Sequence, residues 1–380
     1  DERREYDYLF EEYLAGVVHS ADPSRTYWPS SSHAPFSNLS QRQDSGDTHY
    51  WGVWHGRQPF ESYLERSDRF MTEFGFQSFP DVHTVRRYAA PEDFDLASEV
   101  MRFHQRSGEH GNQRMRETML ERYGLPAAFA DQLTLSQVQQ AEAVRIGVEH
   151  WRRHRTGHQC MGALYWQLND NWPVASWSSI DYFGRWKGLH YAACRFFAPL
   201  LVSSHLRDGN LVVTLVNDTD QRRAGRLTWQ LRTYAGRILR AGSIRARMPA
   251  DAAQDLVQWT CADLLGDTPA TACYFVAVWR DRYSTARGIL HLAPLKDAAL
   301  RDPGLAVAVA DTTVTVSARH FAANVYLDCD DPAWQFSDNF FDLLPREQRV
   351  VQLVPVAAEN TGAPPADVSA HSLWQMTRGA

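Results

Sequence analysis

The chain has 380 residues, 44% of them hydrophobic, which is ordinary for a globular protein and long enough for about two or three domains. Its net charge of −6 at pH 7 gives no overall basic field, so nucleic acid and acidic membrane surfaces are not expected partners. Thirteen Trp, 15 Tyr and 18 Phe make it rich in aromatic side chains. Flat rings stack on the apolar faces of sugars, so a carbohydrate site is one interpretation of this richness and core packing is the other.

The five cysteines include no Cys-x-x-Cys pair, so they predict neither a zinc site nor a disulfide framework. A single bridge between Cys261 and Cys273 stays open as an alternative. No apolar run reaches the length of a membrane-spanning helix, and the N-terminal Asp-Glu-Arg-Arg does not resemble a signal peptide. We therefore expect a soluble protein, periplasmic or cytoplasmic if bacterial, with the compartment left open.

The first 199 residues alternate predicted strands with predicted helices. An opening helix is expected over residues 2–20, where apolar side chains recur at helical spacing. Four short strands, each ending in polar or aromatic residues, are expected at 25–29, 49–54, 69–73 and 161–168. Helices are expected at 59–66, near 93, at 112–123, 134–155 and 187–197. This alternation predicts a parallel sheet, and four such strands predict one half of a (β/α)8 TIM barrel.

After about residue 200 the hydrophobic pattern changes to period two. Leu227, Trp229 and Leu231 alternate with polar residues, which is typical of a strand with one buried face. Further strands are expected at 211–217, 239–247, 273–280, 305–317, 323–328 and 349–355. Two sets of short strands around a linker at 296–304 predict two small β-sandwiches. The predicted domains are 1–199, 200–298 and 299–380.

The most informative segment is Arg69–Pro80, which reads Arg-Phe-Met-Thr-Glu-Phe-Gly-Phe-Gln-Ser-Phe-Pro. A short apolar run is expected to form a strand that ends at Glu73, and Gly75 is expected to let the backbone turn sharply. A carboxylate among aromatic rings suits a retaining glycosidase, in which it attacks the anomeric carbon as a nucleophile. The alternative is a strand-end charge in a salt bridge, and composition alone does not separate the two.

A second candidate segment is Gly162–Pro173, in which an apolar strand runs into an amide and carboxylate cluster. Trp166 is the expected platform beneath a sugar ring. Asn169 and Asp170 are expected either to fix sugar hydroxyls or to support the loop. Alternatively, Trp166 and Trp172 only pack inside the domain and Asn169-Asp170 is a turn.

A third wall of the pocket is predicted in His49–Gly56, which reads His-Tyr-Trp-Gly-Val-Trp-His-Gly. Trp51, Trp54 and His55 are its candidate substrate contacts. For His55, a structural hydrogen bond is an equally good interpretation.

Other catalytic signatures are not supported. His150 and His154 have the i, i+4 spacing of a metal pair, but Trp151 stands where metalloproteases have a glutamate. The chain contains no Gly-x-Ser-x-Gly segment and no glycine-rich phosphate loop. We therefore expect neither a metal nor a cofactor.

Together these segments resemble the β-mannosidases of glycoside hydrolase family 2. Thr72–Pro80 is similar to the family's nucleophile strand, Leu164–Tyr191 to its last barrel strand and following loop, and Phe336–Pro345 to a segment of its C-terminal sandwich. The resemblance covers almost the whole chain in the family's order. It implies barrel strands 5–8 followed by two immunoglobulin-like sandwiches, and a retaining exo-enzyme that releases terminal β-D-mannose from non-reducing ends without a cofactor.

The resemblance also implies roles for individual residues. Glu73 is expected to be the nucleophile at the end of strand seven, and Trp166 the strand-eight platform in the subsite of the cleaved mannose. Trp51 and His55 on strand six are expected to face the pocket. The remaining expected substrate contacts are Trp54, Gln77, Asn169 and Asp170.

The chain departs from the family at the general acid/base. In such enzymes this glutamate follows an asparagine at the end of strand four, and no Asn-Glu pair occurs in these 380 residues. We therefore expect the C-terminal part of a larger β-mannosidase, with an N-terminal half as its partner, inactive alone because retention needs two carboxyl groups. The alternatives are another family 2 specificity, β-glucosaminidase or β-galactosidase, and a non-catalytic sugar-binding or scaffolding fragment.

Overall fold

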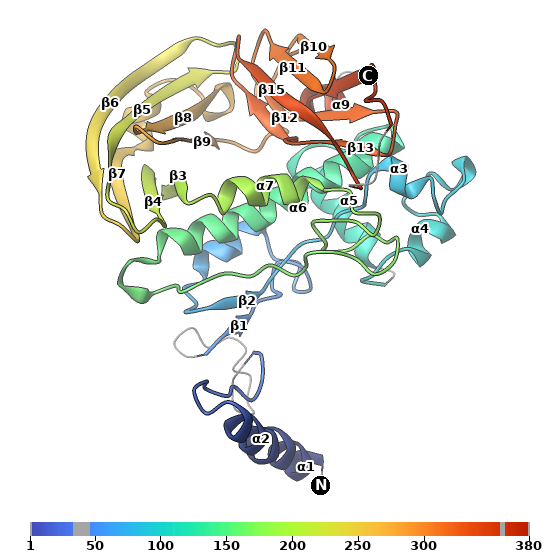
Figure 1. Cartoon of the computed structure of the whole chain (residues 1–380). Coiled ribbons are helices and arrows are strands. Elements are labelled where there is room, and N and C mark those ends of the chain that lie inside the picture. Colours follow the sequence, from blue (N-terminus) through green and yellow to red (C-terminus); the bar gives the residue numbers. More distant parts are fainter. Residues whose placement is uncertain (1, 33–45, 109, 358–361, 379–380) are drawn as a thin grey trace.

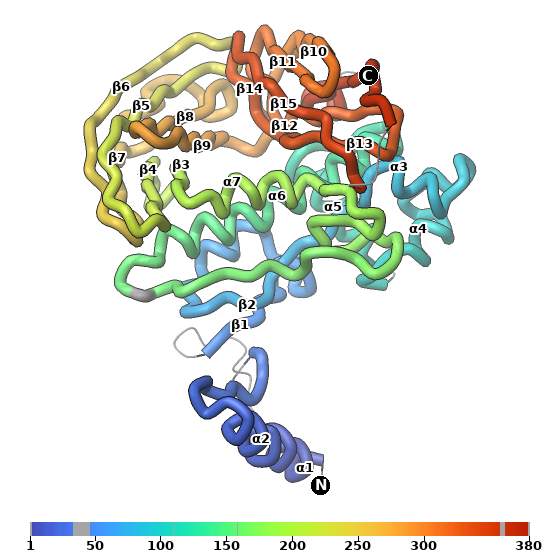
Figure 2. Tube along the Cα trace, in the orientation of Figure 1, coloured from blue at the N-terminus to red at the C-terminus, as the bar shows by residue number. Residues whose placement is uncertain are grey.

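The computed structural model describes residues 2–32, 46–108, 110–357 and 362–378. The chain forms an N-terminal helix, a helical region around three parallel β segments, and two β-sandwiches (Figure 1, Figure 2). The sandwiches pack side by side above the long helix α6, whereas the N-terminal helix projects from the opposite side of the body. In the part of the chain that is described, no helix has the length and apolar character needed to cross a membrane.

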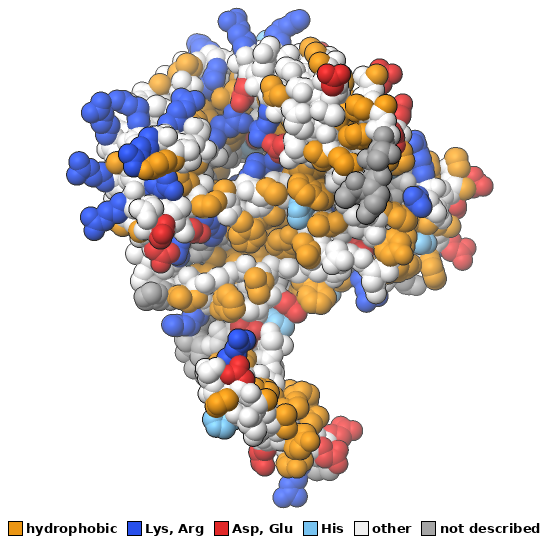
Figure 3. Space-filling model, viewed as in Figure 1, with side chains coloured by type: hydrophobic (Ala, Val, Ile, Leu, Met, Phe, Trp, Pro, Cys, Tyr) orange, Lys and Arg blue, Asp and Glu red, His pale blue; other side chains and the backbone are white. Residues whose placement is uncertain are grey.

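The predicted opening helix is confirmed, and it stands apart from the core. It runs through α1 (Glu2–Asp7), a π-helical turn (Tyr8–Tyr13) and α2 (Leu14–Ala21), none of which buries a residue. Its apolar stripe is exposed, with 58% of Tyr8 and 54% of Tyr13 accessible. Figure 3 shows these hydrophobic side chains gathered along the projecting helix.

The strand predicted at 25–29 is wrong. The described chain forms no strand there, because a turn closed by the Arg25 amide on the Asp22 carbonyl leads into irregular backbone. Pro29 at its end also lacks the N–H that a ladder would need.

Three parallel segments form the centre of the first region. β1 (Thr48–His49) pairs with β2 (Met71–Glu73), and Met71 also forms a parallel bridge with Ala163. The strand predicted at 161–168 is therefore reduced to a bridge in the third segment, residues 163–166. These elements give three adjacent parallel segments and do not by themselves establish a four-stranded half barrel.

The helices around these segments largely follow the predicted ranges. They are a 3-10 helix (Phe60–Glu65), α3 (Val82–Val85), a 3-10 turn (Pro91–Asp93), α4 (Glu99–Phe103), α5 (His110–Arg122), α6 (Phe129–Arg153), a 3-10 turn (Thr156–His158) and α7 (Gly188–Phe196). The longest, α6, buries one full stripe that includes Leu133, Val144 and Val148 and packs against α7. Its burial, rather than helix propensity, explains why 25 residues stay helical.

The second region is a sandwich of antiparallel sheets. β3 (Leu200–Arg207), β4 (Asn210–Asn217) and β7 (Ala252–Thr260) form one sheet, in the order β3-β4-β7. β5 (Arg223–Thr233), β6 (Ile238–Met248), β8 (Cys273–Arg280) and β9 (Thr285–His291) form the other, in the order β6-β5-β8-β9. A short helix, α8 (Cys261–Leu265), follows β7. Leu227 and Leu231 are fully buried between the sheets, as the period-two pattern predicts.

The third region is a second sandwich with its own core. One sheet has the order β10-β11-β15-β13, and the other has the order β14-β12-β16. The bounds are β10 (Leu305–Ala310), β11 (Thr313–Ala318), β12 (Ala322–Cys329), β13 (Trp334–Phe336), β14 (Phe341–Leu343), β15 (Gln348–Pro355), β16 (Val368–His371) and α9 (Leu373–Arg378). Val314, Val316 and Val325 meet in the core between the sheets.

All five cysteines are free thiols, so the alternative of a Cys261–Cys273 bridge is wrong. Cys273 is buried in the core of the second region, whereas Cys261 lies half-exposed at the start of α8.

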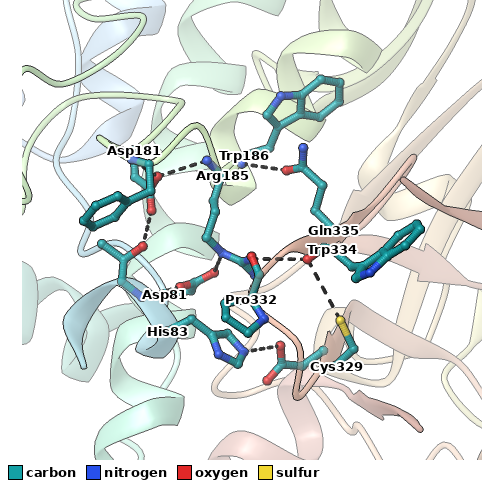
Figure 4. A network of polar contacts seen from close by, with 12 residues as sticks. Asp81, His83, Asp181, Arg185, Trp186, Cys329, Pro332, Trp334 and Gln335 are labelled. Carbon is teal, nitrogen blue, oxygen red and sulfur yellow. Dashed lines mark hydrogen bonds and ion pairs between the residues drawn. The ribbon is translucent and has the colours of Figure 1, made fainter. Parts of the chain in front are cut away.

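A guanidinium group joins the first region to the third (Figure 4). Arg185 lies in the loop after the third parallel segment, and its Nε donates to Asp81 Oδ2 at 2.5 Å. Its Nη1 donates to the carbonyl oxygens of Pro332 at 2.7 Å and Trp334 at 3.2 Å. The Gln335 side chain accepts from the Trp186 amide beside it. Arg185 is therefore one of the side chains, with Arg195 and His83, that hold the third region against the first.

Replacing Arg185 by Met should remove the contacts that its guanidinium group makes with Asp81 and with the third region. The side chains of Arg185 and Asp81 are 10% and 13% exposed, so removing the cation leaves a nearly buried carboxylate without its partner. We expect the free energy of unfolding to fall by about 3–5 kcal/mol, measured by urea denaturation followed by tryptophan fluorescence. Arg207→Met breaks the exposed Arg207–Asp255 pair and should lower stability by about 1 kcal/mol or less. Equal losses in the two variants would contradict the assigned role of Arg185.

Candidate active site

Glu73 ends β2 and lies at the carboxyl end of the three parallel segments. Its backbone carbonyl accepts from the Tyr50 amide at 2.8 Å, which ties it to the chain following β1. The side chain is 27% exposed, and its Oε2 atom lies 3.2 Å from Trp51 Nε1 and 3.3 Å from His49 Nδ1. The indole N–H donates to the carboxylate. Glu73 is therefore oriented by two rings while part of it faces solvent.

A wall of aromatic rings continues from Trp51. The ring centroid of His55 lies 5.3 Å from that of Trp51, and the Trp177 ring is edge-on to Trp51 at 5.7 Å. Trp54 packs edge-on against Trp177 and is 3% exposed, with its Nε1 donating to Ser107. The structure therefore groups Glu73, Trp51 and His55 at one surface and buries Trp54 behind them.

Trp166 lies on the third parallel segment, beside the chain that leaves β2. Its amide donates to the Phe74 carbonyl at 2.9 Å, and its side chain is 45% exposed, as a stacking platform requires. A Cβ atom on Gly75 would lie 2.4 Å from the Trp166 carbonyl oxygen. The expectation that Gly75 makes a sharp turn is thus corrected, since its φ is not in the left-handed region and close approach of Trp166 is what requires glycine.

Behind the site, a buried polar layer joins the chain after Glu73 to the loop after Trp166. The Asp170 carboxylate is 8% exposed and accepts from the hydroxyls of Ser176 and Ser178. Lys187 Nζ donates to the carbonyl oxygens of Ser78 at 3.1 Å and Ser176 at 3.3 Å. Burial lowers the pKa of Lys187 to about 8, with nearby Asp170 opposing the shift. These contacts support the loop, which is one of the two roles predicted for Asp170.

Two further predicted substrate contacts, Gln77 and Asn169, differ in burial. Gln77 is fully buried, and neither of its side-chain amide atoms has a hydrogen-bond partner among the described residues. Asn169 is exposed, and its carbonyl accepts from the Gln167 side chain.

Sequence reasoning did not single out three residues that the structure brings to the site. His49 contacts Glu73 directly, and it lies two residues before Trp51 in the strand predicted at 49–54, where that spacing would place both side chains on one face. In the structure β1 ends at His49 and a turn follows, so that predicted strand is wrong beyond its first residue. Trp177 lies at the centre of the ring cluster. Lys187 is one of only two lysines in a chain with 39 basic residues, a signal that could have marked it.

Within the described ranges, no group of three or more His, Cys, Asp or Glu side chains is arranged to hold a metal ion. His150, one of the possible metal pair, instead has its Nε2 atom 2.9 Å from the Arg66 carbonyl oxygen.

Two family models and several known proteins match parts or most of this chain. Residues 209–297 match a family model described as a mannosidase Ig/CBM-like domain, and residues 300–376 match a mannosidase Ig-fold domain. β-Mannosidase of Rattus norvegicus is 28% identical over 389 aligned positions, covering 91% of this chain and 43% of the relative. β-Mannosidase B of Aspergillus niger is 35% identical over 198 positions, covering 51% of this chain and 23% of the relative.

Solved structures give the same result. The β-D-mannosidase of Dictyoglomus thermophilum superposes with a TM-score of 0.84 at 25% identity, over 96% of this chain and 44% of that one. Over nearly its whole length the chain is therefore similar to β-mannosidases, and its two sandwiches match mannosidase-type Ig domains. The predicted resemblance and the two immunoglobulin-like domains are therefore confirmed.

Other solved structures share the fold. The exo-chitosanase of Amycolatopsis orientalis has a TM-score of 0.69 at 17% identity and covers 86% of this chain, a likeness of fold alone. The chain spans less than half the length of the β-mannosidases it matches, so most of each relative lies outside the aligned region.

Replacing Gly75 by Ala should disturb the site through the Trp166 backbone. The new methyl group would overlap the Trp166 carbonyl oxygen, and we expect a loss of about 1–3 kcal/mol in stability, measured by thermal unfolding. Gly16→Ala is the matched control because nothing lies within 4 Å of its Cβ position in α2. It should leave stability unchanged or raise it by about 0.5–1 kcal/mol. A neutral Gly75→Ala would contradict the close contact.

The buried amine of Lys187 should make stability depend on pH. Its pKa is about 8 in the folded chain and 10.5 when unperturbed, so between these values the unfolded chain binds more protons and stability rises with pH. The stability of the native chain relative to Lys187→Met should therefore grow by about 2–3 kcal/mol between pH 7 and 10.5, measured by urea denaturation.

Lys296→Met is the control, because Lys296 is the other lysine and is exposed. Its stability difference from the native chain should stay level across the same pH range. A level difference for Lys187→Met as well would contradict the effect of burial.

Proposed function

We propose that this chain supplies the nucleophile side of the active site of a retaining exo-β-mannosidase. A Glu73 oxygen would form a bond to the anomeric carbon of a terminal β-D-mannose as the glycosidic C–O bond breaks, and water would later release the sugar. The observation that carries this proposal is the Glu73 carboxylate, half-buried and oriented by Trp51 Nε1 and His49 at the end of β2. Trp166 would stack beneath the sugar ring, and His55 would contact its rim.

The proposal includes a second carboxyl group from outside these 380 residues. Retention requires a general acid/base about 5–5.5 Å from the nucleophile, and the β-mannosidase relatives are more than twice as long as the aligned region. An N-terminal half that completes the TIM barrel around strands 5–8 would supply this group. It would also cover apolar side chains that are exposed in this chain, among them Tyr13 (54%), Leu164 (55%) and Leu168 (57%).

A mechanism-based label tests the nucleophile without the second carboxyl group. In 2-deoxy-2-fluoro-β-D-mannosyl fluoride, fluoride departs without acid assistance, and the fluorine at C2 slows hydrolysis of the product. We expect one covalent adduct per chain, on Glu73, found by intact mass and peptide mapping. Glu121→Gln, which removes an exposed carboxylate on α5, should label normally, and Glu73→Gln should not label. An adduct on another carboxylate would overturn the assignment.

Activity distinguishes the enzyme from its alternatives. Supplied with the preceding half of the parent protein, the chain should hydrolyse 4-nitrophenyl β-mannoside, and Glu73→Gln should lower kcat/KM by at least about a thousandfold. The chain alone should be slower by about 10²–10⁴-fold for want of general acid assistance. Preference for a β-glucosaminide or β-galactoside would favour another family 2 specificity. Sugar binding without hydrolysis in the complemented protein would favour a non-catalytic module.

A further inference from the structure

One sheet of the second region carries arginines and no carboxylates. Strands β5, β6, β8 and β9 together contain eight Arg and neither Asp nor Glu. Residues 209–297 hold twelve Lys and Arg against eight Asp, although the whole chain has a net charge of −6. In Figure 3 the basic side chains gather over this part of the molecule.

Three of these arginines form a row across adjacent strands. Arg226 on β5 lies directly opposite Arg245 on β6 and directly opposite Arg280 on β8. Directly paired residues point to the same face of a sheet, and like charges so placed destabilise it. The neighbouring Leu227 is fully buried and Arg226 is exposed, so the row lies on the outer face. Its presence despite the repulsion points to an anionic partner.

An open hollow of about 740 Å³ lies over this row. Its basic lining residues are Arg226, Arg245, Arg247, Arg280 and Arg282, and we call it the arginine hollow. Among the described residues, Arg245, Arg247 and Arg280 have no carboxylate partner. The guanidinium groups there remain available to a ligand.

The acidic residue in the lining is already engaged. The Asp281 side chain is 1% exposed, and its Oδ1 accepts from the amides of Tyr283 and Ser284 at 2.8 Å. It therefore shapes a turn instead of neutralising the hollow.

The rim of the arginine hollow adds an aromatic surface. Tyr283 is 63% exposed, and the guanidinium carbons of Arg282 and Arg223 lie 4.3 and 4.9 Å from its ring centroid. An exposed ring beside cations can stack on a sugar while the cations bind acidic substituents.

We propose that the arginine hollow binds an acidic polysaccharide whose sugars carry carboxylate or sulfate groups. Guanidinium groups bind such oxyanions through paired N–H donors, and the row spans three strands about 4.8 Å apart, which suits a linear chain of charges. The choice of a polysaccharide over another polyanion rests on the proposed glycosidase function and on the Tyr283 ring. The bound polymer would hold the enzyme beside glycan material without entering the site of Glu73.

Binding is measured on the 380-residue chain, by titration with an oligogalacturonate and with dextran sulfate. The two probes distinguish carboxylate from sulfate as the bound group, and unmodified dextran tests the need for charge. We expect binding of at least one acidic polymer, weakening as salt rises. The triple variant Arg226→Gln, Arg245→Gln, Arg280→Gln should weaken it by at least about tenfold.

A control triple variant removes three positive charges from other parts of the surface. Arg86, Arg116 and Arg301 are exposed and lie outside the sheet, and changing all three to Gln should alter the affinity by less than about twofold if contact rather than net charge matters. Because the triple substitution in the row relieves like-charge repulsion, its melting temperature should not fall below that of the native chain. This measurement separates lost binding from lost folding.

The remaining outcomes overturn the proposal. Absence of binding to both acidic polymers, or an equal loss in the two triple variants, would rule out a site in the arginine hollow. Tighter binding of single-stranded DNA, abolished by the row variant, would assign the hollow to another class of ligand. None of these results depends on hydrolysis, so a failure here leaves the labelling of Glu73 as a separate test of the proposed function.

Discussion

The structure depends on how the chain leaves the strand that ends in Glu73. Residues 76–79 run through the interior without a regular ladder, and buried backbone N–H and C=O groups must find partners. Side chains of α6 provide several: Ser136 Oγ accepts from the Phe79 amide, and Gln140 Nε2 donates to the Phe76 carbonyl. Lys187 Nζ donates to the Ser78 carbonyl from the opposite loop. A long helix is therefore bound to an irregular segment by polar contacts as well as by its apolar stripe.

This arrangement determines the position of the site. The contacts of Lys187 and Gln140 join the segment after Glu73 to the loop after Trp166, since Gln140 Nε2 also reaches the Ser178 carbonyl. Close approach of the Trp166 carbonyl to Gly75 brings the same two pieces of chain together at the surface. The carboxylate and the aromatic platform are thereby held by one network. Arg185 extends that network to the C-terminal sandwich, so this sandwich supports the loops of the site from outside (Figure 4).

Sequence patterns predicted the features that depend on local periodicity, namely which side chains of a strand or helix are buried. Leu227 and Leu231 alternate with polar neighbours and are buried in β5, and α6 follows its helical apolar spacing. Periodicity could not reveal that 161–168 would form an isolated bridge at Ala163 instead of a regular strand, because strand length depends on the segments alongside. Nor could it reveal that Gln77 would be buried, or that the role of Gly75 is set by a carbonyl some ninety residues later in the chain. Motif resemblance led to the prediction of Glu73 and Trp166 as site residues, whereas the contacts around them are products of tertiary packing.

Net charge did not reveal the row of arginines for a related reason. A total of −6 predicts no basic field, yet ions in solution screen exposed charges beyond about 8–10 Å, so a ligand responds to the nearest few side chains. In the sheet β6-β5-β8-β9, antiparallel register places Arg245, Arg226 and Arg280 in one row, although they are far apart in sequence. The remaining residues carry the excess negative charge, so the net charge of the whole chain gives no sign of this row. Where strands bring like charges together, the register of the sheet and not the composition of the chain determines which ligands its surface attracts.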